Sequence, residues 1–256
     1  MIITKLQGGL GNQLFQWAYG KYLSEHFNTE LSLDLSFYQN QFGNTPRTFE
    51  LTNLPNLKVP ERLLPSKPIV YLNDDFTFKP IDYKSNHDYF LNGFWQSEKY
   101  FKSVSNSIKL ELSPTEDKLN ELSKKIEGNS ISLHIRRTDY LISNGFHPTQ
   151  TIQYYQEAIR LIGDYKNIYI FSDDIEWCKN NLTFKNTVFI EGQSNIEDLW
   201  LMSLCDHNVI ANSSFSWWGA WLNNNPNKIV VAPKLWFGEH AGINSGDIVP
   251  ENWIKI

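Results

Sequence analysis

The chain has 256 residues, 41% of them hydrophobic and 20% charged, which is ordinary globular composition with room for one large or two modest domains. The net charge of −5, with no Lys or Arg run longer than two residues, argues against a general nucleic-acid binder. No apolar run approaches the roughly 20 residues of a membrane span, and the first residues lack the regions of a signal peptide. We therefore expect a cytoplasmic protein with no transmembrane segment, or one peripheral to the inner membrane.

Aromatic side chains make up 14% of the residues and include nine Trp. Most of them should form core, and the surplus also suits a flat-sided ligand such as a sugar ring. The two cysteines, Cys178 and Cys205, lie in helix-like segments without a CxxC pattern or neighbouring His ligands. This spacing predicts two buried free thiols rather than a disulfide or a metal site.

The first half begins as strand, turn and helix. A strand is expected at residues 2–6, a glycine-rich turn at 7–11, and a helix capped by Asn12 that runs to about residue 27. Alternating leucines predict a strand at 31–35. Residues 38–84 contain six prolines and read as irregular, and they are followed by a strand at 91–95 and a helix-like segment at 97–101.

A helix start marks the predicted domain boundary. Ser113 stands at the cap position, Pro114 at the first helical position and Glu116 three residues after the cap. We therefore divide the chain into domains at residues 1–112 and 113–256.

The second half alternates strictly between strands and helices. Strands are expected at 131–135, 168–171, 188–190, 209–210 and 229–231, and helices at 151–162, 174–182, 196–205 and 216–222. This order is typical of an α/β fold with a parallel sheet and helices on both faces. Ligands bind beyond the carboxyl ends of such strands, so polar residues at those ends are the candidates for chemistry.

The first strand end carries His134, Arg136, Arg137 and Asp139. Two arginines leaving a buried strand need partners, and the guanidinium fork suits phosphate oxygens. A fixed guanidinium can also stabilise a departing diphosphate without a metal. The alternative is a structural network in which Asp139 pairs with Arg136 or Arg137.

Two further strand ends carry polar residues. Asp173 and Asp174 follow one strand, and we expect one of them to cap the next helix while the other accepts hydrogen bonds from a base such as guanine. The segment Asn212-Ser213-Ser214-Phe215-Ser216 opens a helix and suits a phosphate or ribose, because backbone N–H groups and the helix dipole favour anions there. Trp217, Trp218 and Trp221 on that helix are read as core.

The turn Gly8-Gly9-Leu10-Gly11-Asn12-Gln13 partly matches the dinucleotide fingerprint, and Asp34 stands where its ribose-binding acid would. Leu14 occupies the place of the third glycine. The glycines still indicate that the backbone closely approaches a ligand or a neighbouring strand.

These segments in order, GGLGNQLFQWAYG, GFWQSEKYF, HIRRTDY, FSDD and NSSFSWWGAWL, resemble the α-1,2-fucosyltransferases of glycosyltransferase family 11. The resemblance spans nearly the whole chain except residues 38–89. It implies a GT-B-like fold of two Rossmann-type domains: an acceptor-side domain, and a GDP-sugar domain whose last residues pack back on the first. It also implies inverting transfer of L-fucose from GDP-β-L-fucose to the 2-hydroxyl of a galactose-containing glycan, with no cofactor and no metal.

The resemblance assigns roles by motif position. Arg136 becomes the essential diphosphate contact with His134 nearby, and Asp173 or Asp174 reads guanine. The remaining donor contacts are Arg137, Ser213, Ser214, Phe215 and Ser216, together with Gly9, Gly11, Asn12 and Gln13 from the N-terminal domain.

The catalytic base is not specified by the sequence. α-1,6-Fucosyltransferases carry a glutamate five residues after the arginine motif, where this chain has Asn144. Inverting attack by a hydroxyl usually loses its proton to a carboxylate or histidine. The candidates are Asp34, Glu98, Asp139 and His147, and each also has a structural interpretation.

Three alternatives remain open. A nicotinamide-dependent oxidoreductase would use the glycine turn, but the third glycine and a substrate triad are missing. A carbohydrate-binding protein without activity would leave the strand-end arginines and serines unexplained. Another GDP-sugar transferase, or one that makes another fucose linkage, would share the same fold.

Overall fold

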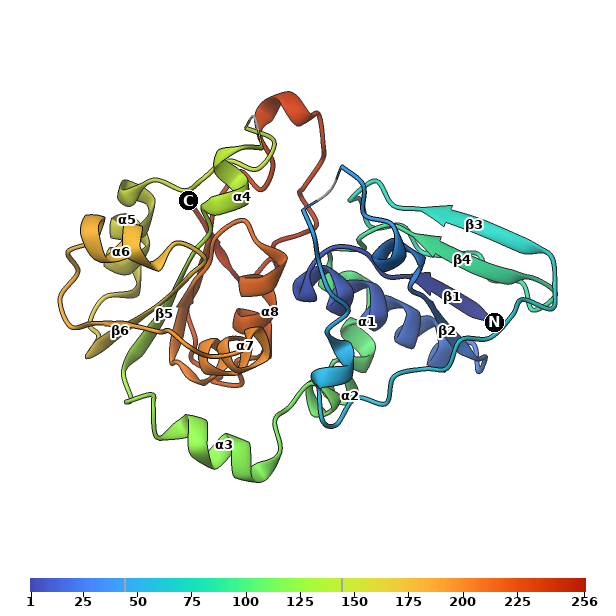
Figure 1. Ribbon diagram of the computed structural model, residues 1–256, viewed down its shortest axis with the longest axis horizontal. Coiled ribbons are helices and arrows are strands. Elements are labelled where there is room, and N and C mark those ends of the chain that lie inside the picture. The colour runs from blue at the N-terminus through green and yellow to red at the C-terminus, as the bar shows by residue number, and fades with distance from the viewer. Residues whose placement is uncertain (44, 144) are drawn as a thin grey trace. The chain divides into compact units, whose positions relative to one another are not determined.

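The computed structural model describes residues 1–43, 45–143 and 145–256, and Figure 1 shows its helices and strands. The chain forms two compact units. The first contains residues 1–113 and 244–250, and the second contains residues 114–243 and 251–256. The returning segment of the first unit is therefore internal to the sequence, while the last six residues stay with the second unit.

The first unit is built on a parallel sheet with strand order β2-β1-β4-β3. Its strands are β1 (Ile2–Lys5), β2 (Leu31–Asp34), β3 (Ile69–Asn73) and β4 (Asp88–Asn92). Helix α1 (Leu10–His26) connects β1 to β2 and buries Leu14, Trp17 and Leu23. Apolar residues at helical spacing on α1 therefore supply the core that the sheet needs on this side.

Shorter elements complete the first unit. They are the 3-10 helices η1 (Ser36–Gln39), η2 (Leu51–Asn53), η3 (Glu98–Tyr100) and η4 (Lys102–Val104), and the helix α2 (Ser105–Glu111). The irregular stretch expected at residues 38–84 is present but contains β3, which the sequence analysis missed. β3 is an edge strand with Tyr71 64% exposed, so it lacks the buried alternation that identifies a strand.

The second unit is built on a parallel sheet with strand order β10-β9-β8-β5-β6-β7. The strands are β5 (Ser130–Ile135), β6 (Asn167–Ser172), β7 (Thr187–Phe189), β8 (His207–Val209), β9 (Val230–Ala232) and β10 (Ile254–Lys255). The helices are α3 (Glu116–Ser123), α4 (Thr138–Leu141), α5 (Ile152–Ile162), α6 (Ile175–Asn181), α7 (Asn195–Leu204) and α8 (Ser214–Leu222), with η5 (Glu239–Ala241). The predicted alternation of strands and helices is confirmed.

Helices cover both faces of this sheet (Figure 1). Ile131, Leu133 and Ile135 of β5 pack in one core with buried residues of α5 and with Cys178 of α6. The other face of β5 carries polar side chains toward α7 and α8. On this face Asn208 Nδ2 of the neighbouring strand β8 donates to Ser132 Oγ of β5 at 2.7 Å. Gly219 lets α8 approach α7, because a Cβ there would lie 2.8 Å from Met202 Cβ.

Three predicted element boundaries are wrong. Gly9, not Asn12, is the N-cap of α1, and Asn12 lies within its first turn. Thr115, not Ser113, caps α3 by accepting from the backbone N–H of Lys118, because the chain enters this helix two residues later than predicted. The strand expected at 91–95 ends at Asn92, and Trp95 instead adopts a left-handed backbone with φ of 54°.

The aromatic and cysteine predictions are confirmed. Trp217 and Trp218 are fully buried and Trp221 is 6% exposed, and their rings pack against one another within 6.0 Å. Cys178 and Cys205 are buried and free.

Candidate functional site

The arginine motif follows β5 directly, and its first arginine is held by two carboxylates. Arg136 Nε and Nη2 donate to Asp139 Oδ1 and Oδ2 at 2.9 and 2.8 Å, and Nε also lies 3.2 Å from Asp173 Oδ2. Burial alone would lower the pKa of Arg136, but these two carboxylates raise it. The Arg–Asp network considered as an alternative therefore exists, and it orients a permanently charged guanidinium at the strand end.

Arg137 is held differently. Its Nε donates to Asp174 Oδ2 at 3.1 Å, and its guanidinium lies 3.7 Å from the centroid of the Trp177 ring. Asp174 also caps α6, since Oδ1 accepts from the Trp177 backbone N–H at 3.3 Å. The prediction that one of the two aspartates caps the next helix is thus confirmed for Asp174.

Asp173 joins the loop after β6 to the loop after β5. Its carboxylate accepts from the backbone N–H of Arg137 at 2.9 Å and of Thr138 at 3.2 Å, and also from the Thr138 hydroxyl. It therefore holds the amino end of α4 and one side of Arg136. Because both aspartates already accept several hydrogen bonds, guanine recognition by either one stays a prediction.

His134 is buried beside the arginine. Its side chain faces Phe215, with ring centroids 5.7 Å apart, and the residue is 4% exposed. Burial lowers the pKa of His134 to about 3 and the charge of Arg136 adds to this, so the imidazole is neutral at physiological pH. Nδ1 is buried without a hydrogen-bond partner among the described residues.

The amino end of α8 lies next to the same loop. Tyr140 lies under Arg136, with its ring centroid 5.9 Å from Cζ, and its hydroxyl donates to the Asn212 carbonyl at 2.7 Å. Ser213 is the N-cap of α8 but makes no side-chain hydrogen bond to the helix amides. Ser214 and Phe215 open the helix, and the buried Ser216 donates to the Ser213 carbonyl. The positive end of the helix dipole therefore faces the arginine loop without a side-chain cap, as at anion sites.

Two polar residues near α7 were missed by the sequence analysis. Asp198 Oδ1 and Gln193 Oε1 are both buried without a partner among the described residues. Burial raises the pKa of Asp198 to about 7, and the neighbouring charge of Glu197 adds to it. Gln193 and Asp198 stand at the N′ and N4 positions of α7, one on each side of its first residues. Only burial distinguishes them from surface residues, so the sequence held no usable signal.

The four candidate bases fall in different units. Asp34 ends β2, where both its oxygens accept from Ser36. Glu98 lies in η3, which Ser97 caps, and pairs with Lys102 at 3.2 Å. Asp139 accepts hydrogen bonds from Arg136 with both oxygens. His147 stacks on Tyr140 with ring centroids 4.8 Å apart, and burial lowers its pKa. Which of the four accepts the proton stays a prediction, and Asn144 lies outside the described residues.

The predicted donor contacts of the first unit surround the amino end of α1. Gly9 is the N-cap and Gly11 is buried in the first turn. Gln13 is fully buried, donates to the Gly8 and Thr48 carbonyls and accepts from the Glu50 backbone N–H. Its side chain therefore fastens the turn, whereas Asn12 keeps the more accessible position.

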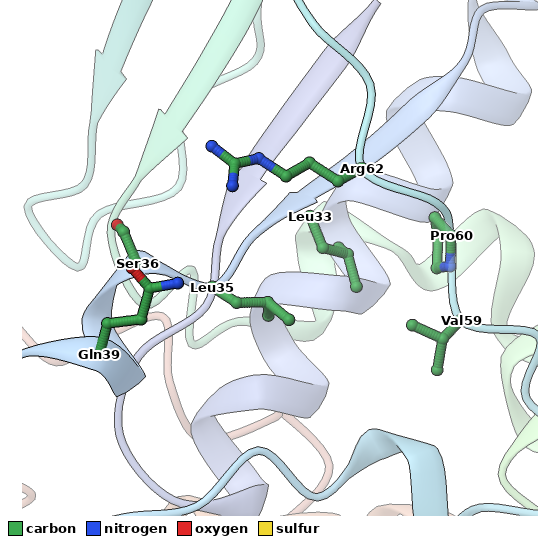
Figure 2. Close-up of a pocket in the computed structure, with 7 residues that line it drawn as sticks. All are labelled: Leu33, Leu35, Ser36, Gln39, Val59, Pro60 and Arg62. Carbon is green, nitrogen blue, oxygen red and sulfur yellow. The ribbon is translucent and has the colours of Figure 1, made fainter.

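A hollow of about 210 Å³ lies beside β2 in the first unit (Figure 2). Leucines 33 and 35 form part of its wall and Arg62 extends across it, and the other lining residues are Ser36, Gln39, Val59 and Pro60. Asp34 does not line it, although both its neighbours do. The hollow thus contains none of the predicted site residues.

The described residues contain neither a metal-binding cluster nor a membrane-spanning helix. No group of three or more His, Cys, Asp or Glu side chains is arranged to hold a metal ion within residues 1–43, 45–143 and 145–256. In that same part of the chain, no helix has the length and apolar character needed to cross a bilayer.

Comparison with known proteins identifies the family. Residues 71–256 match glycosyl transferase family 11. An α-1,2-colitosyltransferase of Escherichia coli is 38% identical over 100% of this chain and 99% of its own length. The O-antigen biosynthesis glycosyltransferase WbnK of Escherichia coli is 32% identical over 98% and 99%. The chain belongs to glycosyltransferase family 11.

The fold agrees with this membership. The NodZ α-1,6-fucosyltransferase of Bradyrhizobium, in a crystal soaked with GDP-fucose, superposes with a TM-score of 0.51 at 15% identity. The match covers 86% of this chain and 91% of that one. The family 11 protein described here is therefore a glycosyltransferase of the α/β, GT-B-like fold that the resemblance implied.

Proposed function

We propose that this glycosyltransferase moves L-fucose from GDP-β-L-fucose to the 2-hydroxyl of a galactoside, with inversion and without a divalent metal. The observation that carries the proposal is Arg136, oriented by Asp139 beside the uncapped amino end of α8. Support comes from the α-1,2 linkage in the name of the colitosyltransferase and from GDP-fucose in the NodZ crystal.

The transfer needs one bond made and one broken. The acceptor oxygen attacks C1 of fucose from the face opposite the diphosphate, and the C1–O bond breaks with its electron pair leaving on GDP. Negative charge then grows on the β-phosphate, where the fixed guanidinium of Arg136 and the α8 dipole stabilise it. The acceptor hydroxyl loses its proton to a base, for which His147 and the three carboxylates remain candidates.

We assign guanine recognition to Asp198 in place of Asp173 or Asp174. Guanine presents N1–H and an amino group as neighbouring donors, and Asp198 and Gln193 offer two buried acceptor oxygens that are unused within the described chain. α7 follows β7, so its amino end lies at the carboxyl edge of the sheet, where nucleotides bind in such folds.

The test is Arg136→Ala, with Arg160→Ala as the matched control. Arg160 is an exposed arginine of α5 that pairs with Glu157, so its loss should leave activity unchanged. Arg136→Ala should lower kcat by roughly 10²–10³-fold, the usual cost of removing a group that stabilises transition-state charge. Assays use GDP-fucose and a panel of β-galactosides with a chelator present, and NMR determines the product linkage. Near-full activity of Arg136→Ala would contradict the role of this residue.

A second donor is favoured by one observation. The 38% identical relative is named for colitose, which is L-fucose without its 3-hydroxyl. GDP-colitose and GDP-fucose should therefore be compared at equal concentration. A higher kcat/KM for GDP-colitose would replace the sugar in the proposal while leaving the GDP site and the linkage in place.

A further inference from the structure

Two polar side chains meet at the carboxyl edge of the first unit's sheet. Asn12 lies in the first turn of α1, which follows β1, and Gln96 lies four residues after the end of β4. Gln96 Nε2 donates to Asn12 Oδ1 at 2.8 Å. This hydrogen bond joins two segments that are 84 residues apart in the sequence.

The bond to Gln96 decides which end of the Asn12 amide is available. Because Oδ1 is occupied, Nδ2 points away from Gln96 and lies against the glycine turn. A Cβ on Gly8 would come within 2.6 Å of this nitrogen, and Gly8 has φ of 80°. Asn12 Nδ2 forms no hydrogen bond within the described parts of the chain, so a donor with a fixed direction stands at the turn.

The same turn is the amino end of a long helix. α1 has 17 residues, its N-cap is Gly9, no side chain caps it, and its first turn contains no acidic residue. The first amides and the Asn12 NH₂ group therefore favour an oxygen that accepts hydrogen bonds, and an anionic one most of all.

Gln96 is unusual among the buried glutamines of this unit. Gln16 uses both ends of its amide on backbone, accepting from Gln7 N at 2.9 Å and donating to the Gly93 carbonyl at 3.0 Å. Gln96 is 8% exposed, its one bond goes to Asn12, and its Oε1 is buried without a partner among the described residues. A buried amide with an unused oxygen is unfavourable for stability, so its position needs another reason.

The backbone before Gln96 also points to function. Trp95 is bulky and buried, yet it has φ of 54°, a conformation that such residues rarely adopt. The backbone N–H groups of Phe94 and Trp95 both donate to Asp74 Oδ2, at 3.1 and 2.8 Å, which holds the loop in this shape. Strain of this kind persists at functional sites, where the surrounding structure enforces it.

We propose that Gln96 is a positioning residue: it fixes the Asn12 amide so that Nδ2 donates to an oxygen of the GDP-sugar at the amino end of α1. This inference rests on the proposed function. The oxygen belongs either to the diphosphate or to the sugar, and both accept a hydrogen bond in the same way.

A double-mutant cycle with Gln96→Met and Asn12→Ala tests the proposal. Each single variant should raise KM for GDP-fucose about fivefold to tenfold, the usual effect of one lost hydrogen bond. If Gln96 acts through Asn12, the double variant should match Asn12→Ala alone instead of showing the product of the two effects. Gln96→Glu, which can accept from Asn12 but not donate, should turn the Asn12 amide round and show the same rise in KM with an intact fold.

Gln16→Met is the control, because Gln16 is also buried but bonds only to backbone. Its effect should multiply with that of Asn12→Ala. Inhibition by GDP separates the two oxygens: a parallel rise in the GDP inhibition constant places the oxygen on the diphosphate, and an unchanged constant places it on the sugar. Multiplicative effects of Gln96→Met and Asn12→Ala, with the unaltered enzyme active on GDP-fucose, would overturn the role of Gln96 without touching the proposed function.

Discussion

Replacing Asp198 by Asn should stabilise the free enzyme above neutral pH and weaken its binding of GDP. Burial raises the pKa of the Asp198 carboxyl from 3.8 to about 7, with repulsion from Glu197 adding to burial and Lys125 acting in the opposite direction. Between these two pKa values the folded protein holds a proton that the unfolded chain has lost. Stability therefore falls as pH rises from about 4 to about 7, and stays at the lower level above that.

The size of this effect follows from the shift. About three pKa units at 1.36 kcal/mol each correspond to an upper limit of about 4 kcal/mol. Asparagine has the same shape and no charge at any pH, so the variant avoids this cost. Asp198→Asn should exceed the unaltered protein in unfolding free energy by about 2–4 kcal/mol at pH 8 and by less than about 1 kcal/mol at pH 4.

Urea unfolding at pH 5, 6, 7 and 8 measures the stability difference, with Asp164→Asn at an exposed position as control. Calorimetry with GDP measures the second effect. If the ionised carboxylate accepts the guanine N–H groups, GDP affinity should fall up to tenfold per unit as pH drops below 7, and this slope should disappear in Asp198→Asn. A variant that is no more stable at pH 8, or that binds GDP as tightly as the unaltered protein, would refute the reasoning.

Two further predictions concern the strand-end network and the core. Asp173→Asn should lower the unfolding free energy by about 2–3 kcal/mol and kcat/KM by at least tenfold, because its new NH₂ group meets the N–H groups of Arg137 and Thr138. Denaturation measures the first effect and steady-state kinetics the second. Trp217→Ala should cost about 3–5 kcal/mol because a fully buried indole leaves a cavity, and a loss below about 1 kcal/mol would show that Trp217 is not core.

The second unit could be predicted from sequence far better than the first. Its strands and helices are short, strictly alternating and apolar on the buried face, as Ile131, Leu133 and Ile135 show, so periodicity alone finds them. β3 and β10 have exposed residues and depend on their neighbours in the sheet, and no local pattern marks them. The predicted cap of α1 was wrong for a related reason. Asn12 belongs to a residue type that often caps helices, but here its amide bonds to Gln96, which is distant in sequence.

The site was predictable only as far as residue type and strand position allow. Arginines at a strand end indicate an anion, and the geometry around Arg136 agrees with this reading. Which of several aspartates meets the ligand is a question of hydrogen bonds already made, and a sequence does not record those.

The carboxylates of the second unit differ in the hydrogen bonds that they already make within the protein. Asp139, Asp173 and Asp174 accept bonds from guanidinium or backbone N–H groups, so their charge is already matched within the protein. Asp198 keeps a buried oxygen without a partner in the described chain and lowers stability for it. A ligand with N–H donors can remove this destabilisation by donating hydrogen bonds to the unpaired oxygen when it binds. We therefore propose that Asp198 is the carboxylate that selects the base, while Arg136 stabilises the charge of the leaving diphosphate.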